Sequence, residues 1–260
     1  MDYLKYTSSL DKNMIKTQCA YCGSYVLSYS EEAFCHFCEG HVSKTESNND
    51  QTYQSILSIR NLISTKHTSE AISAADSLSI KQTSPRVLFG LANIYRTLSN
   101  HIYFDTNYNL DGFMYKNSDN IYLSLDLISK SKEMFYKHIK LSVETDPIST
   151  FTLFISNLKL ERMIYAKKLL EKLVNMPGLI SNYAIMAYSA ENKLKQADIS
   201  ALKMIDSSTN SLYYLSKCLI NMNKREEAEK ILERLTTTID MPDAFYLLLK
   251  LRRLKDETKI

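Results

Sequence analysis

One spacing constrains this chain more than any other feature: a small side chain recurs every 31 residues, at Ala166, Ala197 and Ala228. An apolar residue follows each alanine four positions later, and a second apolar stretch precedes each of these segments. A fixed period of about 20–50 residues is typical of proteins built from stacked repeats. Because each period contains two helix-length apolar segments, residues 147–239 are predicted to form three successive helical hairpins.

The composition agrees with a helical chain. Gly (5) and Pro (4) are scarce among the 260 residues, which argues against a turn-rich β fold. The net charge of +3 is too small to indicate a nucleic-acid or membrane partner by itself. The start of the chain is polar, and Asn, Pro and Gly interrupt the longest uncharged run, so neither a leader nor a membrane span is predicted. We therefore expect a soluble cytoplasmic protein with reduced thiols.

Four of the five cysteines form two Cys-x-x-Cys pairs, Cys19 with Cys22 and Cys35 with Cys38. Two such pairs at this separation are typical of a metal site with four thiolate ligands. Each pair would occupy a tight turn that directs two sulfurs at one centre, and two such turns would complete a tetrahedron. The pattern therefore predicts a metal site made of all four thiolates.

The cysteine region resembles a zinc ribbon over roughly residues 15–42. Gly23 and Gly40 can take the positive φ that such turns often need, and residues 24–29 are typical of a β-hairpin arm. The resemblance implies one structural Zn²⁺ with no open coordination position for catalysis. So small a unit needs the metal to fold, and it is expected to unfold without metal while the helical body stays intact. A redox iron with the same ligands and a pair of disulfides remain alternatives.

The repeat spacing also appears earlier, around Ala71, so residues 52–84 are predicted to form another helix pair. Pro85 can begin the next helix, because its missing N–H costs nothing in the first turn. The pattern breaks over residues 99–119, which are rich in Asn, Asp, Tyr and Phe. A loop of this length is often functional or disordered. Two interpretations remain open: an extended helix or insertion, and an aromatic loop that contacts a partner.

The alternation of helix pairs resembles tetratricopeptide repeats. Glu70-Ala71 and Glu227-Ala228 match the acidic-plus-alanine dipeptide that opens the second helix of each pair in that family. The family has Gly at the turn between the helices. Asn192 and Asn223 stand there in this chain and tolerate the left-handed conformation, whereas Lys66 and Glu161 do not fit that requirement. The resemblance implies an array of α-helical hairpins.

These patterns predict a mainly α chain, an α-α superhelix of stacked hairpins that follows a small N-terminal β zinc ribbon. The ribbon and its flanking polar segment are assigned to residues 1–48, and the helical repeat domain to residues 49–260. The predicted helical units are 52–84, 85–146 with the insertion 99–119, 147–177, 178–208, 209–239, and a cap helix over 242–255.

Stacked helical hairpins form a curved inner surface lined by the first helix of each pair. The residues predicted to lie on this surface are Phe151, Ile155, Asn182, Met186, Tyr213 and Lys217. Such a mixture suits an apolar or helical peptide. The alternative is that Phe151 and Ile155 belong to the core.

The chain contains no phosphate-binding Gly-rich loop, no His pair at helical spacing and no recognisable nucleophile motif. We therefore predict a non-enzymatic scaffold that binds protein or peptide partners through the inner surface and the ribbon. The alternative is a nucleic-acid-associated or transcription-related factor, because a ribbon followed by a helical body also resembles archaeal transcription factor B. Residues 1–49 carry four Lys against six acidic residues, which argues against phosphate contacts by the ribbon.

Overall fold

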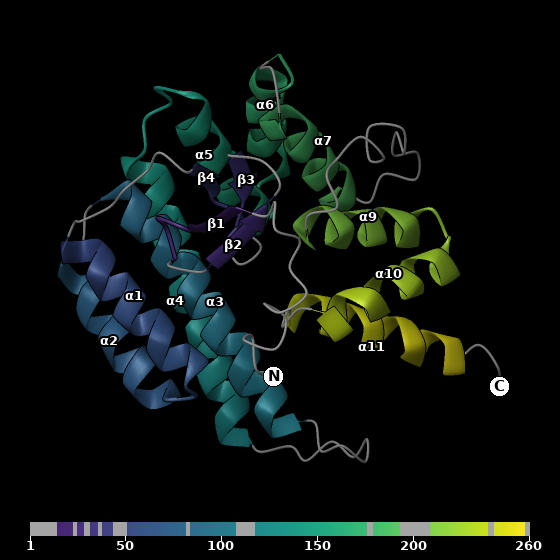
Figure 1. Cartoon of the computed structure of the whole chain (residues 1–260), viewed down its shortest axis with the longest axis horizontal. Helices are drawn as coiled ribbons and strands as arrows, with labels where there is room; N and C mark the ends of the chain where they lie inside the picture. The colour runs from purple at the N-terminus through teal and green to yellow at the C-terminus, as the bar shows by residue number, and fades with distance from the viewer. Residues whose placement is uncertain are drawn as a thin grey trace. The chain divides into compact units, whose positions relative to one another are not determined.

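The computed structural model describes residues 15–22, 25–28, 32–35, 38–43, 51–81, 84–107, 118–175, 179–192, 209–238 and 242–257. Within these ranges the chain is mainly helical, with short antiparallel strands near its N-terminus (Figure 1). It forms two compact units. The strand-containing unit comprises Met1–Cys19, Tyr25–Ser47 and Pro177–Ile260, and the central unit comprises Ala20–Ser24 and Asn48–Met176.

The strands form two antiparallel hairpins, one around each cysteine pair. In the first cysteine hairpin, β1 (Ile15–Gln18) pairs with β2 (Tyr25–Ser28). In the second cysteine hairpin, β3 (Glu32–Phe34) pairs with β4 (His41–Ser43). The strand predicted within residues 24–29 is present, but its partner lies in β1, where the sequence shows no clear alternation. Each Cys-x-x-Cys pair is therefore held in the turn between two paired strands.

The central unit consists mainly of helices that pack in chain order. Their bounds are α1 Gln51–Ser64, α2 Thr68–Lys81, α3 Pro85–Asn107, α4 Ser118–Leu141, α5 Pro147–Lys159 and α6 Met163–Leu173. Helix α1 packs against α2 and α3, and α2 packs against α3. The contacts then continue from α3 to α4, from α4 to α5 and from α5 to α6. Large buried side chains, among them Phe89, Tyr95 and Phe135, fill the space between these helices.

Helix α3 continues beyond the point where the sequence pattern breaks. Residues 99–107 are helical, so the loop interpretation is wrong for this part of the 99–119 segment, and residues 108–117 lie outside the described ranges. Ser99 is buried and its hydroxyl group donates to the Ser124 carbonyl of α4 at 2.9 Å. Burial of Ile102 adds an apolar contact to this extension. Helix α3 extends beyond the segment with apolar periodicity because α4 packs along the extension.

The starts of two helices follow directly from local sequence. Pro85 begins α3 and Pro147 begins α5, where the missing proline N–H leaves no hydrogen bond unmade. Asp146 precedes α5 and accepts hydrogen bonds from the backbone N–H groups of Ile148 and Ser149, both at 2.9 Å. These hydrogen bonds, first among them the one from Ser149, lower the pKa of Asp146. The cap therefore fixes where α5 starts.

The turns inside three helix pairs share one left-handed residue. Lys66, Glu161 and Asn223 have φ values of 62°, 57° and 63°. At each turn two backbone N–H groups reach back to carbonyls of the preceding helix, as in a Schellman motif; the Glu161 N–H donates to Leu158 at 3.0 Å and the Arg162 N–H to Asn157 at 2.8 Å. The prediction that Lys66 and Glu161 do not fit a left-handed turn is wrong. Hydrogen bonding of the helix end outweighs the steric cost of a side chain there.

Replacing Glu161 with glycine is expected to raise the free energy of unfolding by about 0.5–1 kcal/mol. Relief of a left-handed penalty of about 1–2 kcal/mol exceeds the extra entropy that glycine loses on folding. Urea denaturation measures the change. Glu171→Gly is the matched control, because Glu171 is an exposed residue inside α6 and its replacement should cost about 1 kcal/mol. Equal destabilisation by both substitutions would contradict the strain at Glu161.

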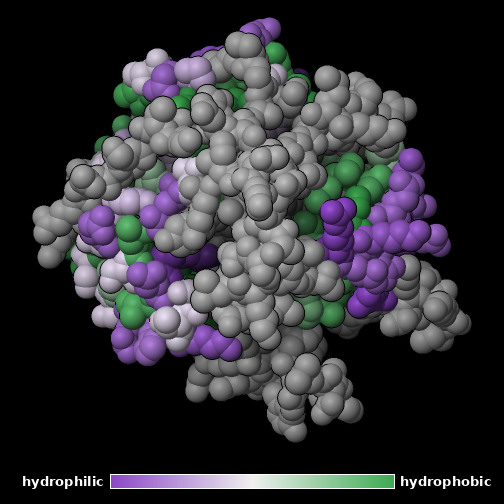
Figure 2. All heavy atoms as spheres, viewed as in Figure 1, coloured by the Kyte–Doolittle hydropathy of each residue, from purple (hydrophilic) through white to green (hydrophobic). Residues whose placement is uncertain are grey.

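The helices of the strand-containing unit also pack on their neighbours. Their bounds are α7 Leu179–Glu191, α9 Thr209–Asn221, α10 Arg225–Thr238 and α11 Pro242–Glu257. Helix α7 packs on α9, α9 on α10, and α10 on α11. In Figure 2 the coloured residues in the region of α9–α11 show apolar atoms beside hydrophilic ones, as expected for helices that bury a single face.

The repeating alanines that the structure describes are buried. Ala166 of α6 and Ala228 of α10 are fully buried, whereas Ala197 lies outside the described residues. Ala228 belongs to a core cluster with residues of α9 and α11, including Leu219 and Leu248. A small side chain at this position lets α10 approach both neighbouring helices closely.

Candidate metal centre

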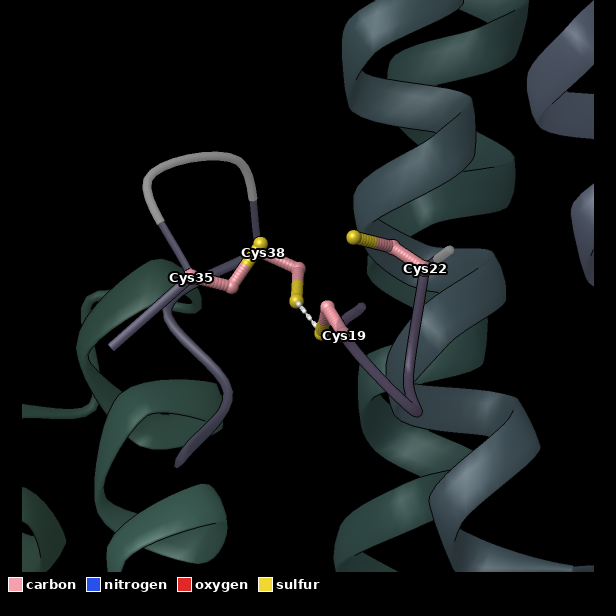
Figure 3. A group of neighbouring side chains, drawn as sticks. All are labelled: Cys19, Cys22, Cys35 and Cys38. Atoms are coloured by element: carbon pink, nitrogen blue, oxygen red, sulfur yellow. Dashed lines mark hydrogen bonds between the residues drawn. The ribbon is translucent and has the colours of Figure 1, made fainter. Parts of the chain in front are cut away.

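The two cysteine pairs converge on one point. Their four sulfur atoms all lie within 4.8 Å of one another, and the four side chains are fully buried (Figure 3). The Cys19 and Cys38 sulfurs are 3.5 Å apart, far beyond a disulfide bond of about 2.05 Å. Bonds of about 2.3 Å to a tetrahedral zinc ion would place sulfurs about 3.8 Å apart. Cys19, Cys22, Cys35 and Cys38 could therefore coordinate a metal ion.

The chemistry of the surroundings also fits a metal. The Gly40 N–H points at the Cys38 sulfur, with 3.4 Å between nitrogen and sulfur. Such a backbone donor stabilises negative charge on a thiolate ligand. Thiolates are soft ligands that favour zinc and iron over magnesium or calcium. The structure thus supports the predicted ligand set, in which all four donor atoms are of the soft thiolate kind.

In the second cysteine hairpin Glu39 has the left-handed conformation (φ 63°), and it directly precedes Gly40, the glycine predicted for this turn. The Glu39 N–H donates to the Cys35 carbonyl at 2.9 Å, and the Cys35 N–H donates to the Gly40 carbonyl at 2.9 Å. These bonds close the turn around the cysteine pair. Gly23, the glycine predicted for the first turn, lies outside the described residues. A side chain in a conformation that favours glycine calls for a compensating contact.

That contact is made by the Glu39 carboxylate, which is buried within the strand-containing unit. Its Oε2 atom accepts hydrogen bonds from the hydroxyl groups of Tyr214 at 2.6 Å and Tyr183 at 3.2 Å. Burial, followed by the charge of Glu39, raises the pKa of both tyrosines well above the usual value, so both hydroxyl groups stay protonated and donate. Glu39 thereby connects the second cysteine hairpin to α7 and α9.

Aromatic packing strengthens the same connection. The Phe34 ring of β3 stacks on Tyr183 with centroids 4.4 Å apart, and Tyr183 meets Tyr214 edge-on at 5.6 Å. His41 is buried beside the Phe34 ring. The second cysteine hairpin is therefore part of the core of its unit.

Tyr21, in the turn between Cys19 and Cys22, packs on α3 within the central unit. The Tyr21 ring meets Phe89 edge-on with centroids 5.5 Å apart, and the Arg86 guanidinium lies 5.1 Å from the centre of the same ring. Gly90 lies directly beneath the Tyr21 backbone, because a Cβ atom at position 90 would lie 2.1 Å from the Tyr21 carbonyl oxygen. The sequence predicted the start of α3 at Pro85 but gave no role to Gly90. The glycine permits contact between two backbones.

The residues predicted to bind a partner do not form one exposed surface among the described residues. Phe151 and Ile155 are fully buried, which favours the core interpretation, and Met186 is 1% exposed. Tyr213 and Lys217 are half-buried, and the Lys217 ammonium group pairs with Glu191 at 2.6 Å. The side chain of Asn182 lies outside the described residues. Among the members of this set whose side chains the structure describes, Tyr213 and Lys217 are the partly exposed ones.

No protein-family model, curated protein or solved structure matches this chain. The residues themselves therefore define its class: a mainly helical chain with a buried cluster of four cysteines near the N-terminus that could hold a metal ion. Among the helices that the structure describes, none combines the length and apolarity needed to cross a bilayer.

Proposed function

We propose that this chain is a non-enzymatic scaffold for protein–protein interaction, with a zinc-ribbon-like site joined to a tetratricopeptide-like array of helical hairpins. The observation that carries the metal assignment is the closed set of four buried thiols, all within 4.8 Å. Four thiolates fill a tetrahedral coordination shell, so a bound zinc ion would have no position for substrate. The zinc would therefore stabilise the fold and would take no part in catalysis.

The helix packing supports the scaffold part of the proposal. Pairs such as α5 with α6 and α9 with α10 are joined by left-handed turns at Glu161 and Asn223, and within each unit successive described helices pack on one another. Helical-hairpin arrays use the surfaces between neighbouring pairs to bind peptides. A reducing cytoplasmic setting, which belongs to the same proposal, would keep the thiols available to the metal.

The test begins with metal analysis of the purified chain. One zinc per chain with a colourless protein is expected; iron with four thiolates would absorb visible light and would replace the zinc assignment. The chain is then used as bait in the cells that make it, with nuclease treatment and with or without chelator. Recovery of the same protein partners at constant stoichiometry, reproduced with purified components, supports the scaffold.

The alternative function gives a different result. A transcription-related or nucleic-acid-associated factor would lose its partners on nuclease treatment and would bind DNA or RNA with an affinity that falls steeply as salt increases. That outcome, without a stable protein partner, would overturn the scaffold proposal. It would leave the metal assignment standing, because metal content is measured independently.

A further inference from the structure

A groove with a volume of about 680 Å³ lies within the central unit, bounded by the end of α4, by α5 and by α6. The buried side chains of Leu153 and Leu169 line it, together with the exposed side chains of Val143 and Tyr165, which are 70% and 53% accessible. Its size falls within the about 300–1,000 Å³ of sites that bind ligands. The groove therefore offers apolar surface that the described part of the chain leaves open to solvent.

Two buried polar atoms in this groove lack hydrogen-bond partners among the described residues. The Asn157 side chain is 3% exposed, and its amide nitrogen donates to the Leu153 carbonyl at 2.8 Å, but its Oδ1 atom has no donor. The Ser142 hydroxyl oxygen is likewise buried and unpaired. Buried polar atoms are nearly always hydrogen-bonded, and an unpaired one lowers stability. Asn157 lines the groove, so an N–H group of a bound ligand would supply the missing donor.

Positive charges predominate around the groove. Three basic side chains line it, against one acidic side chain, Glu144, which pairs with Lys172. Arg162 is held over the Tyr165 ring, with its guanidinium carbon 4.3 Å from the ring centre. Lys168 is exposed on α6. The excess of positive charge favours an anionic ligand.

We propose that this groove binds a short acidic peptide segment of a partner protein. A backbone N–H of the peptide donates to Asn157, an apolar side chain packs between Val143 and Tyr165, and Asp or Glu side chains lie near Lys168 and Lys172. A fully deprotonated phosphate would supply charge but neither the N–H donor nor the apolar group. This inference rests on the proposed scaffold function and specifies the chemistry of its partner.

The test uses random-sequence peptides displayed on phage, selected against the purified chain. Enrichment of peptides that combine acidic and apolar residues is expected. The affinity of an enriched peptide, measured by fluorescence anisotropy, should fall by roughly tenfold or more when Lys168→Glu is combined with Lys172→Glu, because both attractions become repulsions. Lys167→Glu is the matched control, since Lys167 is exposed on the same helix but does not line the groove. The affinity of the Lys167→Glu variant for the peptide should stay within roughly twofold of that of the unaltered chain.

Asn157→Leu separates binding from folding. Leucine has a similar size and removes the unpaired acceptor, so peptide affinity should fall while the thermal midpoint is maintained or rises. Three results would overturn the groove proposal. The selection could enrich no peptides, or it could enrich basic ones. The enriched peptide could also bind the Lys168→Glu, Lys172→Glu variant and the Lys167→Glu control with equal affinity. The proposal would also be overturned if a labelled single-stranded oligonucleotide bound more tightly than the peptides and the same double variant no longer bound it.

These outcomes are distinguishable from failure of the scaffold proposal. If the groove substitutions leave peptide affinity unchanged, this groove is not the binding site, and the scaffold function would belong to a different surface. Absence of any stoichiometric protein partner in the bait experiment would refute the scaffold function itself.

Discussion

Replacing Cys38 with serine is expected to abolish metal binding and to destabilise α7 and α9 together with the second cysteine hairpin. The hairpin lies in the core of the strand-containing unit, where Phe34 stacks on Tyr183 and the Glu39 carboxylate accepts from Tyr214. Loss of a structural metal is among the few changes that cost more than about 4 kcal/mol. The sequence alone suggested an appendage whose unfolding leaves the helices intact. The buried contacts lead to the opposite expectation.

Metal analysis and hydrogen exchange together check this result. The Cys38→Ser chain should contain no stoichiometric zinc, and amides of α7 and α9 should exchange faster than those of the unaltered chain. Unchanged metal content would show that the ligand assignment is wrong. Faster exchange restricted to residues 15–43 would show that the hairpin does unfold independently of the helices.

Two matched substitutions isolate the role of the metal. Cys218 of α9 is buried but lies outside the four-cysteine cluster, and burial raises the pKa of its thiol to about 11. Cys218→Ala should keep one zinc per chain and cost only about 1–2 kcal/mol through the lost packing. Tyr214→Phe keeps all four thiols and removes one donor to Glu39, so metal content should be retained while stability falls by about 1.5–3 kcal/mol.

Replacing Gly90 with alanine is expected to destabilise the chain, although helix propensity alone favours alanine by about 1 kcal/mol. The added Cβ atom would lie 2.1 Å from the Tyr21 carbonyl oxygen, which is a backbone atom and cannot rotate away. Either α3 or the turn that carries Cys19 and Cys22 must shift. Overpacking of this kind costs about 1–3 kcal/mol or more, and displacement of the turn should also weaken metal affinity.

Urea denaturation and chelator competition measure the two effects of Gly90→Ala. Ser73→Ala provides the control for propensity, because Ser73 is exposed on α2, and alanine there should be neutral or slightly stabilising. If the Gly90→Ala variant is more stable than the unaltered chain and has the same metal affinity, then α3 does not lie this close to the Tyr21 backbone.

Local sequence determined a large part of this protein. The two Cys-x-x-Cys pairs identified all four residues of the cluster. Three of the described helices, α3, α5 and α11, begin at Pro85, Pro147 and Pro242, as local chemistry predicts. The repeat spacing around Ala71 predicted the pair α1 and α2, and the alanine spacing marked the buried position of Ala228. Each of these signals is a residue type or a spacing along the chain, which a sequence displays directly.

Only the tertiary structure decided the roles of Glu39, Gly90 and Asn157. The carboxylate of Glu39 meets Tyr183 and Tyr214 across separations of 144 and 175 residues, and Gly90 meets a turn near the start of the chain. Phe151 looked like a surface residue in the repeat register and is buried. Burial and hydrogen-bond partners depend on which distant segments meet, and helical periodicity specifies only which face of a helix is apolar. The sequence therefore predicts the elements and the metal ligands, whereas long-range packing determines which polar side chains are enclosed.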